Sequence, residues 1–205
     1  MKREAKTGGR VHLCTNIKTF QPFDLSTKLK QDFYNRNTLE VAKDLLGCKL
    51  CRKVGDEVLS GIIVETEAYT QDDPACHAFR GKTPRAITLF KQPGIAYVYF
   101  IYGMYHCFNV ITEPEETAGA VLIRALEPIC GICNTNGPAK LCRELQITKE
   151  LNEIDLTSEK SCLWIEKGVE IQKSQIHTTT RIGIKQAADY PWRFYVKGNK
   201  FISKK

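Results

Sequence analysis

Residues 61–69, Gly-Ile-Ile-Val-Glu-Thr-Glu-Ala-Tyr, constrain the fold of this chain more than any other stretch. Alternate side chains of a β-strand point to opposite faces. Two carboxylates roughly 7 Å apart and a phenol on one face are poor core material and suit the wall of a cleft. This pattern predicts a site with a general base, but an exposed acidic face on an edge strand explains it equally well. One face would carry Ile62, Val64, Thr66 and Ala68, and the other Ile63, Glu65, Glu67 and Tyr69.

The length of the chain, 205 residues, suits one large domain or two small ones. The sequence holds no apolar run near the roughly 20 residues that span a membrane, and its first residues lack the apolar block of a signal peptide. We therefore expect a soluble, intracellular protein with no membrane partner.

Positive charge is concentrated near the N-terminus. The first 30 residues hold seven Lys or Arg and two Asp or Glu, so they account for five of the seven excess positive charges. Residues 1–24 are predicted to form a flexible basic arm. A second basic cluster lies in the long loop predicted at residues 70–94, together with His77. Long loops are often functional, so we favour a functional loop over a merely solvated one. The cluster consists of Arg80, Lys82, Arg85 and Lys91.

Nine cysteines in a chain without a secretory signal are expected to be reduced thiols. Two CxxC pairs, Cys48/Cys51 and Cys130/Cys133, have a spacing seen in zinc sites. The two pairs are much farther apart than in a zinc ribbon, and the first falls in a predicted strand, where side chains three residues apart diverge. We therefore expect most of the cysteines to be small apolar fillers rather than metal ligands.

The remaining pattern predicts short helices and antiparallel strands. Helices are predicted at residues 28–34, 38–46 and 138–145, the second capped by Asn37 or Thr38 and the third opened by Pro138. Hairpins are predicted at residues 48–68, turning at 55–56, and at 96–112, turning at 102–104. Further strands are predicted at residues 119–126, 162–166, 169–172 and 193–196, with a last turn at 198–199.

Two polar side chains interrupt apolar strands. Arg124 lies in the run 119–126, where a buried guanidinium is costly without a carboxylate partner. Glu65 and Glu67 are the candidate partners. Asn109 must also find a hydrogen-bond partner inside its strand or serve as one.

The hairpin at residues 96–112 is rich in tyrosine, and Tyr102 falls at its tip, where packing in a core is a weak explanation. An aromatic hairpin that packs on a sheet would account for the other tyrosines.

Five blocks of the sequence occur in the order found in one enzyme family. They are Val-Glu-Thr-Glu-Ala-Tyr at 64–69, Tyr-Val-Tyr-Phe-Ile-Tyr-Gly-Met-Tyr at 97–105, Arg-Ala-Leu-Glu-Pro at 124–128, Asn-Gly-Pro-Ala-Lys-Leu-Cys at 136–142 and Arg-Ile-Gly at 181–183. With these blocks the chain resembles the alkyladenine DNA glycosylase family, also called the eukaryotic-type 3-methyladenine DNA glycosylases. The resemblance runs from about residue 32 to residue 203.

The resemblance implies a single mixed α+β domain at residues 25–205, with a curved, mostly antiparallel β-sheet, flanking helices and a protruding β-hairpin. It implies a monofunctional DNA glycosylase that flips alkylated or deaminated purines out of duplex DNA and hydrolyses the N-glycosidic bond to start base excision repair. Its partner would be double-stranded DNA containing damaged purines, in a bacterial cytoplasm or a nucleus, and the protein would be a monomer. Neither a metal nor an organic cofactor takes part in this chemistry.

The roles of family residues carry over to matching positions of this chain. Glu67 matches the general base, and Arg124 and the Ile182 carbonyl match the groups that hold the attacking water. The base pocket would consist of Tyr69, His77, Tyr99 and Asn109, and the intercalating tip of Tyr102. Contacts with the DNA backbone are expected at Thr83, Arg85 and Lys140.

Physical chemistry supplies reasons for these roles. Flipping a base costs a few kcal/mol of unstacking, and stacking on tyrosine returns about 1 to 3 kcal/mol without reading the identity of the base. Cleavage of the N-glycosidic bond builds positive charge on the sugar, which a carboxylate such as Glu67 can stabilise while it takes a proton from water. A neighbouring Arg124 would favour the charged carboxylate.

Two functions of other classes are weighed against this one. A protein of the same fold could bind damaged DNA without cleaving it, but such a binder does not need a buried pair of Glu67 and Arg124. A metal hydrolase could use Glu65, Glu67 and His77, but the sequence lacks a compact HxxxH-type ligand set.

Overall fold

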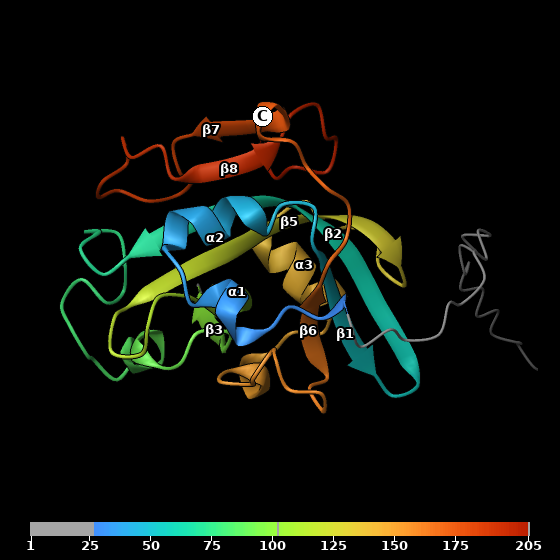
Figure 1. The fold of residues 1–205 in the computed structure, drawn as a ribbon, viewed down its shortest axis with the longest axis horizontal. Coiled ribbons are helices and arrows are strands. Elements are labelled where there is room, and N and C mark those ends of the chain that lie inside the picture. The colour runs from blue at the N-terminus through green and yellow to red at the C-terminus, as the bar shows by residue number, and fades with distance from the viewer. Residues whose placement is uncertain (1–26, 102, 205) are drawn as a thin grey trace, which may run out of the picture.

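The computed structural model describes residues 27–101 and 103–204. The basic arm expected at residues 1–24 and the tip residue Tyr102 lie outside the described residues. The described chain is a mixed α+β domain, as predicted, in which a curved antiparallel sheet carries short helices (Figure 1).

Two long strands form the centre of the sheet and cross the middle of the molecule in Figure 1: β2 (Glu57–Thr70) and β5 (Gly119–Cys130). The strand order is β3-β4-β5-β2-β1-β6, and β8 pairs with both β2 and β7. All pairs among the described strands are antiparallel. The shorter strands are β1 (Lys49–Val54), β3 (Ala96–Ile101), β4 (Tyr105–Ile111), β6 (Leu163–Glu166), β7 (Ile176–Thr179) and β8 (Arg193–Val196).

The helices are short and cover the central strands. α2 begins where predicted because the Asn37 side chain accepts a hydrogen bond of 3.0 Å from the backbone N–H of Leu39. α2 packs on β2 and β5, and α3 packs on β4 and β5. No helix within the described ranges has the length and apolar character needed to cross a membrane. The helices are α1 (Gln31–Tyr34), α2 (Thr38–Asp44) and α3 (Pro138–Glu144), with 3-10 turns η2 (Ile87–Phe90), η3 (Lys149–Leu151) and η4 (Lys173–Gln175).

The pairing of β2 with β5 is irregular where the two carboxylates lie. The register shifts between Ile63 and Glu65 and again between Glu65 and Thr66. Ile63 and Thr66, three residues apart, therefore both point into the main core, where the Thr66 hydroxyl donates to the Ala42 carbonyl at 2.7 Å. The prediction that Ile63 shares a face with Glu67 was wrong, because strict alternation does not continue through a β-bulge.

β3 and β4 form the predicted hairpin at one end of the strand order. Ile101 pairs with Tyr105, and the turn passes through Gly103, whose φ of 67° is a conformation that favours glycine. Met104 beside it is 63% exposed. The described part of the hairpin tip thus presents an apolar side chain to solvent.

The C-terminal quarter differs from the prediction in two places. Residues 169–172 are not a strand; they pass along Gly47 instead, whose carbonyl accepts a hydrogen bond of 2.8 Å from the Val169 N–H. The approach is close, since a Cβ on Gly47 would lie 2.1 Å from the Val169 carbonyl oxygen. β7 was not predicted, because its sequence, Ile-His-Thr-Thr, has little apolar character and its stability comes from pairing with β8.

Several cysteines are part of the core, as predicted. Burial raises the pKa of Cys48 to about 12 and that of Cys76 to about 11, so both are protonated thiols at neutral pH. Cys107 and Cys142 are also buried with raised pKa values. These side chains therefore act as small apolar residues.

Candidate active site

Glu65 is fully buried and surrounded by hydrogen-bond donors. Its Oε1 accepts hydrogen bonds from Nε of Arg124 at 3.0 Å and Nε of Arg193 at 2.7 Å. Ser203 donates to both carboxylate oxygens, from Oγ to Oε1 at 2.8 Å and from the backbone N–H to Oε2 at 2.5 Å. Glu65 thus links β2 to β5, to β8 and to the C-terminal residues. These contacts are those of a residue that stabilises the fold.

Glu67 is equally buried but has fewer donors. Its Oε2 accepts a hydrogen bond of 2.8 Å from the Tyr69 hydroxyl and lies 3.2 Å from Nη1 of Arg124. Its Oε1 accepts one hydrogen bond, of 2.7 Å, from the backbone N–H of Ile182. Each carboxylate oxygen has two lone pairs, so Oε1 retains one that can accept a hydrogen bond from a water molecule.

Arg124 bridges the two carboxylates, so both candidate partners predicted from the sequence pair with it. Its side chain is 8% exposed. Burial disfavours the charge, but Glu67 and Glu65 outweigh burial and raise the pKa of Arg124 above its ordinary value. A permanent positive charge therefore lies against both acids.

A cavity of about 110 Å³ begins at Tyr69, one hydrogen bond away from Glu67. Its walls come from β2, from the loop after β2, from the β3–β4 hairpin, from the start of β5 and from the segment before β8. All four side chains predicted for a base pocket lie in these walls: Tyr69, His77, Tyr99 and Asn109.

His77 is held in one tautomer by its neighbours. Its Nδ1 lies 2.9 Å from the hydroxyl of Tyr97, and that hydroxyl donates its single proton to the Arg85 carbonyl at 3.0 Å. Nδ1 must therefore carry the imidazole proton, which leaves Nε2 as an acceptor. Burial, assisted by the positive charge of Arg85, lowers the pKa of His77 to about 4. The imidazole in the cavity wall is neutral at physiological pH.

The other polar groups of the cavity are also neutral. Burial raises the pKa values of Tyr69 and Tyr99 above the ordinary value for tyrosine, so both phenols keep their protons. The Tyr99 ring lies 4.8 Å from the His77 ring, in an edge-to-face contact. Asn109 has the partner that the sequence required, because its Nδ2 donates to the Tyr97 carbonyl at 3.1 Å. The cavity therefore offers aromatic surfaces and orientated dipoles.

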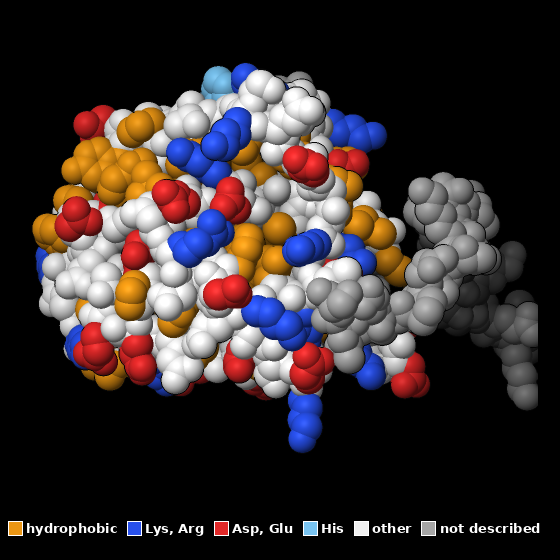
Figure 2. Space-filling model, in the orientation of Figure 1, with side chains coloured by type: hydrophobic (Ala, Val, Ile, Leu, Met, Phe, Trp, Pro, Cys, Tyr) orange, Lys and Arg blue, Asp and Glu red, His pale blue; other side chains and the backbone are white. Residues whose placement is uncertain are grey.

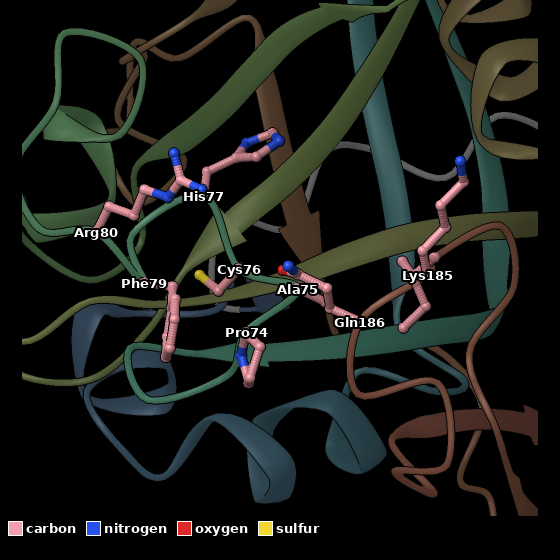
Figure 3. Close-up of a pocket in the computed structure, with 9 residues that line it drawn as sticks. Pro74, Ala75, Cys76, His77, Phe79, Arg80, Lys185 and Gln186 are labelled. Carbon is pink, nitrogen blue, oxygen red and sulfur yellow. The ribbon is translucent and has the colours of Figure 1, made fainter.

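A wider, open groove of about 510 Å³ adjoins the cavity and shares four of its lining residues. Figure 3 shows the loop that carries His77 and Arg80 on one side of this groove and the loop that carries Lys185 on the other. Phe79 also lines it and is 51% exposed. The groove thus combines cations and an aromatic ring at the mouth of the cavity.

The three residues predicted to contact a DNA backbone lie in different places. The Thr83 hydroxyl accepts a hydrogen bond of 3.2 Å from the Ala86 N–H and so caps a turn. The Arg85 guanidinium lies over the Tyr99 ring at 5.5 Å, close to the cavity. Lys140 is on α3, where its ammonium donates to Asn136 at 2.8 Å, and it does not line the cavity or the groove.

Charge on the surface is mixed. On the face seen in Figure 2, Lys and Arg alternate with Asp and Glu over most of the molecule. This distribution agrees with the sequence, in which the residues beyond the first 30 carry only two of the seven excess positive charges. The cations that line the groove, Arg80 and Lys185, are the groups that could meet an anionic partner at the mouth of the cavity.

The three ligands expected for a metal hydrolase, Glu65, Glu67 and His77, do not form a metal site. In the described parts of the chain, no three His, Cys, Asp or Glu side chains converge in a way that could hold a metal ion. Glu65 and Glu67 are instead held by arginines, and His77 by Tyr97.

Four residues of this region were missed by the sequence analysis. Arg193 and Ser203 bind Glu65 from the far end of the chain, and Arg181 forms a buried ion pair with Asp73. These partners are more than 100 positions apart in the sequence, so no local pattern could pair them. The available signal was the Arg-Ile-Gly block at 181–183, which matched the family without a role for its arginine.

A family model and individual relatives of this chain point to the same enzyme family. The family model described as Methylpurine-DNA glycosylase matches residues 32–200. A protein of Carboxydothermus hydrogenoformans is 52% identical, over 86% of this chain and 99% of its own. A protein of Alkaliphilus oremlandii is 46% identical, over 87% and 100% of the two chains, and one of Herpetosiphon aurantiacus is 43% identical, over 87% and 90%. All three bear the name "Putative 3-methyladenine DNA glycosylase".

The fold, the site and these similarities define the class of the protein as a DNA glycosylase, an enzyme of DNA repair that hydrolyses N-glycosyl compounds. Within that class, the chain belongs to the methylpurine-DNA glycosylase family.

Proposed function

We propose that this enzyme flips alkylated or deaminated purines out of double-stranded DNA and hydrolyses their N-glycosidic bond with a water molecule activated by Glu67. The observation that carries the proposal is the position of Glu67. It is held by Arg124, Tyr69 and the Ile182 N–H, and it lies one hydrogen bond from an aromatic cavity.

The cavity suits a flipped base. Tyr69 and Tyr99 line it, and stacking of a base on such a ring is worth about 1 to 3 kcal/mol whatever the base is. That gain offsets part of the few kcal/mol needed to unstack a base, a cost that is smallest for damaged pairs. His77 and Asn109 present orientated polar atoms to the base edge, and Tyr102 would fill the gap left in the duplex.

Glu67 suits the chemical step. Departure of the base leaves positive charge on the sugar, which a buried carboxylate stabilises strongly because little water screens it. The free lone pair on Oε1 can accept a hydrogen bond from the attacking water, with Arg124 and the Ile182 carbonyl as further partners for that water. Proton transfer to a positioned base contributes roughly 10²- to 10⁴-fold to the rate.

The groove at the mouth of the cavity suits the DNA backbone. Arg80 and Lys185 line it, and Arg85 lies close by, beside Tyr99. The backbone contacts expected from the sequence are Thr83, Arg85 and Lys140. To these we add Arg80 and Lys185. Each phosphate that they neutralise should steepen the salt dependence of binding by about 0.9 in a log–log plot.

The product is an abasic site. Among the described residues, the lining of the cavity includes no lysine that could form a Schiff base with the sugar. The enzyme would therefore release the damaged base and leave the DNA strand uncut.

The test is single-turnover cleavage of a duplex with one hypoxanthine or one ethenoadenine, using the wild type and Glu67→Gln. Alkali after the reaction cuts the DNA at abasic sites. Cutting that depends on both alkali and the wild-type glutamate supports the proposal. If neither protein produces abasic sites while both bind the lesion selectively, the protein is a binder of damaged DNA instead.

A further inference from the structure

We propose that Arg181 is a positioning residue of this site, which aligns Tyr69 and the loop carrying His77 with Glu67 without touching the reacting atoms. The inference rests on the function proposed above, in which Tyr69 stacks on a base and Glu67 activates water. Nothing in the chemistry of the reaction itself requires a buried arginine at this place in addition to Arg124.

Arg181 and Asp73 form a two-pronged ion pair, and both side chains are completely buried. Nη2 donates to Oδ1 at 2.9 Å, and Nη1 donates to Oδ2. A bidentate pair of this kind fixes orientation as well as distance. Asp73 also accepts a hydrogen bond of 3.0 Å from the Ala75 N–H, so the pair holds the start of the loop that supplies Ala75 and His77 to the cavity.

The same guanidinium contacts two further segments. Nη1 donates to the Ala68 carbonyl at 3.0 Å, on β2 between the proposed base and the tyrosine that lines the cavity. Nη2 lies 3.3 Å from the Ala187 carbonyl, to which it donates. Arg181 therefore joins β2, the loop after β2 and the segment before β8, which all contribute walls to the cavity.

Arg181 also packs on the Tyr69 ring. Its guanidinium carbon lies 4.6 Å from the centre of that ring and 5.2 Å from the centre of the Trp192 ring. Contact between a flat cation and an aromatic face is favourable and limits rotation of the ring. With one face covered by Arg181, Tyr69 has its other face and its edge left to line the cavity.

The residue that follows Arg181 contacts the proposed base directly. The Ile182 N–H donates to Glu67 at 2.7 Å. Because the side chain of Arg181 is fixed by Asp73 and the next backbone amide by Glu67, displacement of the arginine would move a hydrogen-bond donor of the catalytic carboxylate. A shift of about 1 Å at a reacting group can reduce a rate about 100-fold.

Stability and positioning can be separated experimentally. Removal of one partner of a buried pair leaves an uncompensated charge, whereas replacement of both by apolar residues of similar volume is often neutral for stability. We therefore use the double variant Arg181→Met/Asp73→Leu. Because the Ala68 and Ala187 carbonyls and the Ala75 N–H also lose their partners, it should unfold at a lower temperature than the wild type but remain folded in the assay. The folded protein should excise ethenoadenine about 10- to 100-fold more slowly in single turnovers and bind undamaged duplex normally.

The control is another ion pair, Lys49 with Glu166, which joins β1 to β6 at 2.5 Å, is less buried than Arg181 and Asp73, and does not line the cavity. The double variant Lys49→Met/Glu166→Leu should keep the wild-type excision rate. A further variant, Arg181→Lys, keeps the positive charge. It cannot form the two parallel hydrogen bonds to Asp73 or pack a flat guanidinium on the Tyr69 ring. It should recover stability more completely than it recovers excision.

Two outcomes would overturn the inference. Normal excision by a folded Arg181→Met/Asp73→Leu protein would mean that the pair is only structural, and full excision by Arg181→Lys would mean that charge alone suffices. Lesion binding in a Glu67→Gln background provides a separate measure, in which loss of Arg181 should reduce the preference for ethenoadenine over undamaged duplex by about 10-fold. If the wild type excises nothing, the proposed function fails. The role of Arg181 is tested separately, because it is contradicted if loss of Arg181 leaves the preference for ethenoadenine over undamaged duplex unchanged.

Discussion

Glu65 and Glu67 lie two residues apart on β2, both fully buried and both paired with Arg124, but only Glu67 is hydrogen bonded to a residue that lines the cavity. The sequence motif alone could not give a physical reason to choose between them. The hydrogen-bond partners of the two acids supply that reason. Glu65 binds a second arginine, Arg193, whereas Glu67 accepts hydrogen bonds from a phenol and a backbone amide.

Replacement of the two acids should have opposite effects on stability and activity. Glu65→Gln leaves Arg193 without its carboxylate, so it should lower the free energy of unfolding by about 3 kcal/mol or more. The folded fraction should retain most of its excision rate. Glu67→Gln should abolish excision with a smaller loss of stability, because Arg124 keeps Glu65. Chemical denaturation together with single-turnover excision measures both, and equal loss of excision would contradict the assignment.

Tyr69 is predicted to have two separable functions. Tyr69→Phe removes the hydroxyl that donates to Glu67 but keeps the ring, so excision should slow while lesion affinity is preserved. Tyr69→Leu removes the stacking surface and should weaken lesion binding by about 1 to 3 kcal/mol. Fluorescence anisotropy in a Glu67→Gln background gives the affinities. Tyr195→Phe, whose ring contacts His177 instead of the cavity, serves as the control.

His77 makes stability depend on pH. Its pKa is lowered from 6.5 to about 4 in the folded protein, so the unfolded chain binds the proton more readily between these values. Stability should therefore fall as the pH drops from 6.5 to about 4, by up to about 3 kcal/mol from this group. Urea denaturation across this range should show a smaller fall for His77→Gln. Equal pH dependence of the two proteins would mean that the imidazole is not buried as described.

Salt dependence should reveal which cations contact DNA. Arg80→Gln and Lys185→Gln should each reduce the slope of log affinity against log salt by up to about 0.9, if each neutralises one phosphate. Lys53→Gln, an exposed change on β1 that does not line the groove, should leave the slope unchanged. Identical slopes in all three variants would place the DNA backbone elsewhere.

Tyr102 at the hairpin tip is predicted to act as a wedge. Tyr102→Ser should weaken binding to damaged duplex and slow excision, because nothing would fill the gap left by the flipped base. The effect should be smaller on a lesion in single-stranded DNA, where no stack has to be opened. Wild-type affinity and excision on duplex would refute the wedge.

Local signals predicted most of the elements. The cap at Asn37, the proline at the start of α3 and the turn at Gly55 each satisfy a backbone requirement that a few neighbouring residues specify. β7 escaped because its four residues depend on pairing with β8. The strand predicted at 169–172 failed because its apolar residues meet Gly47 instead of a neighbouring strand.

The site was predicted unevenly for a related reason. The walls of the cavity come from compact motifs, and the resemblance located them. The partners of Glu65 come from residues 193 and 203, and the bulge in β2 depends on how β5 pairs with it. Periodicity assumes an unbroken strand, so it put Ile63 on the wrong face.

The buried cysteines bear on how such an enzyme survives the conditions in which it is needed. Electrophiles that methylate purines also attack sulfur, and they react with thiolates far faster than with thiols. Cys76 lines the cavity, yet burial raises its pKa to about 11, and Cys107 on β4 is protected in the same way. The buried thiols beside the cavity are thereby held in their protonated form, which reacts with such electrophiles more slowly than the thiolate does.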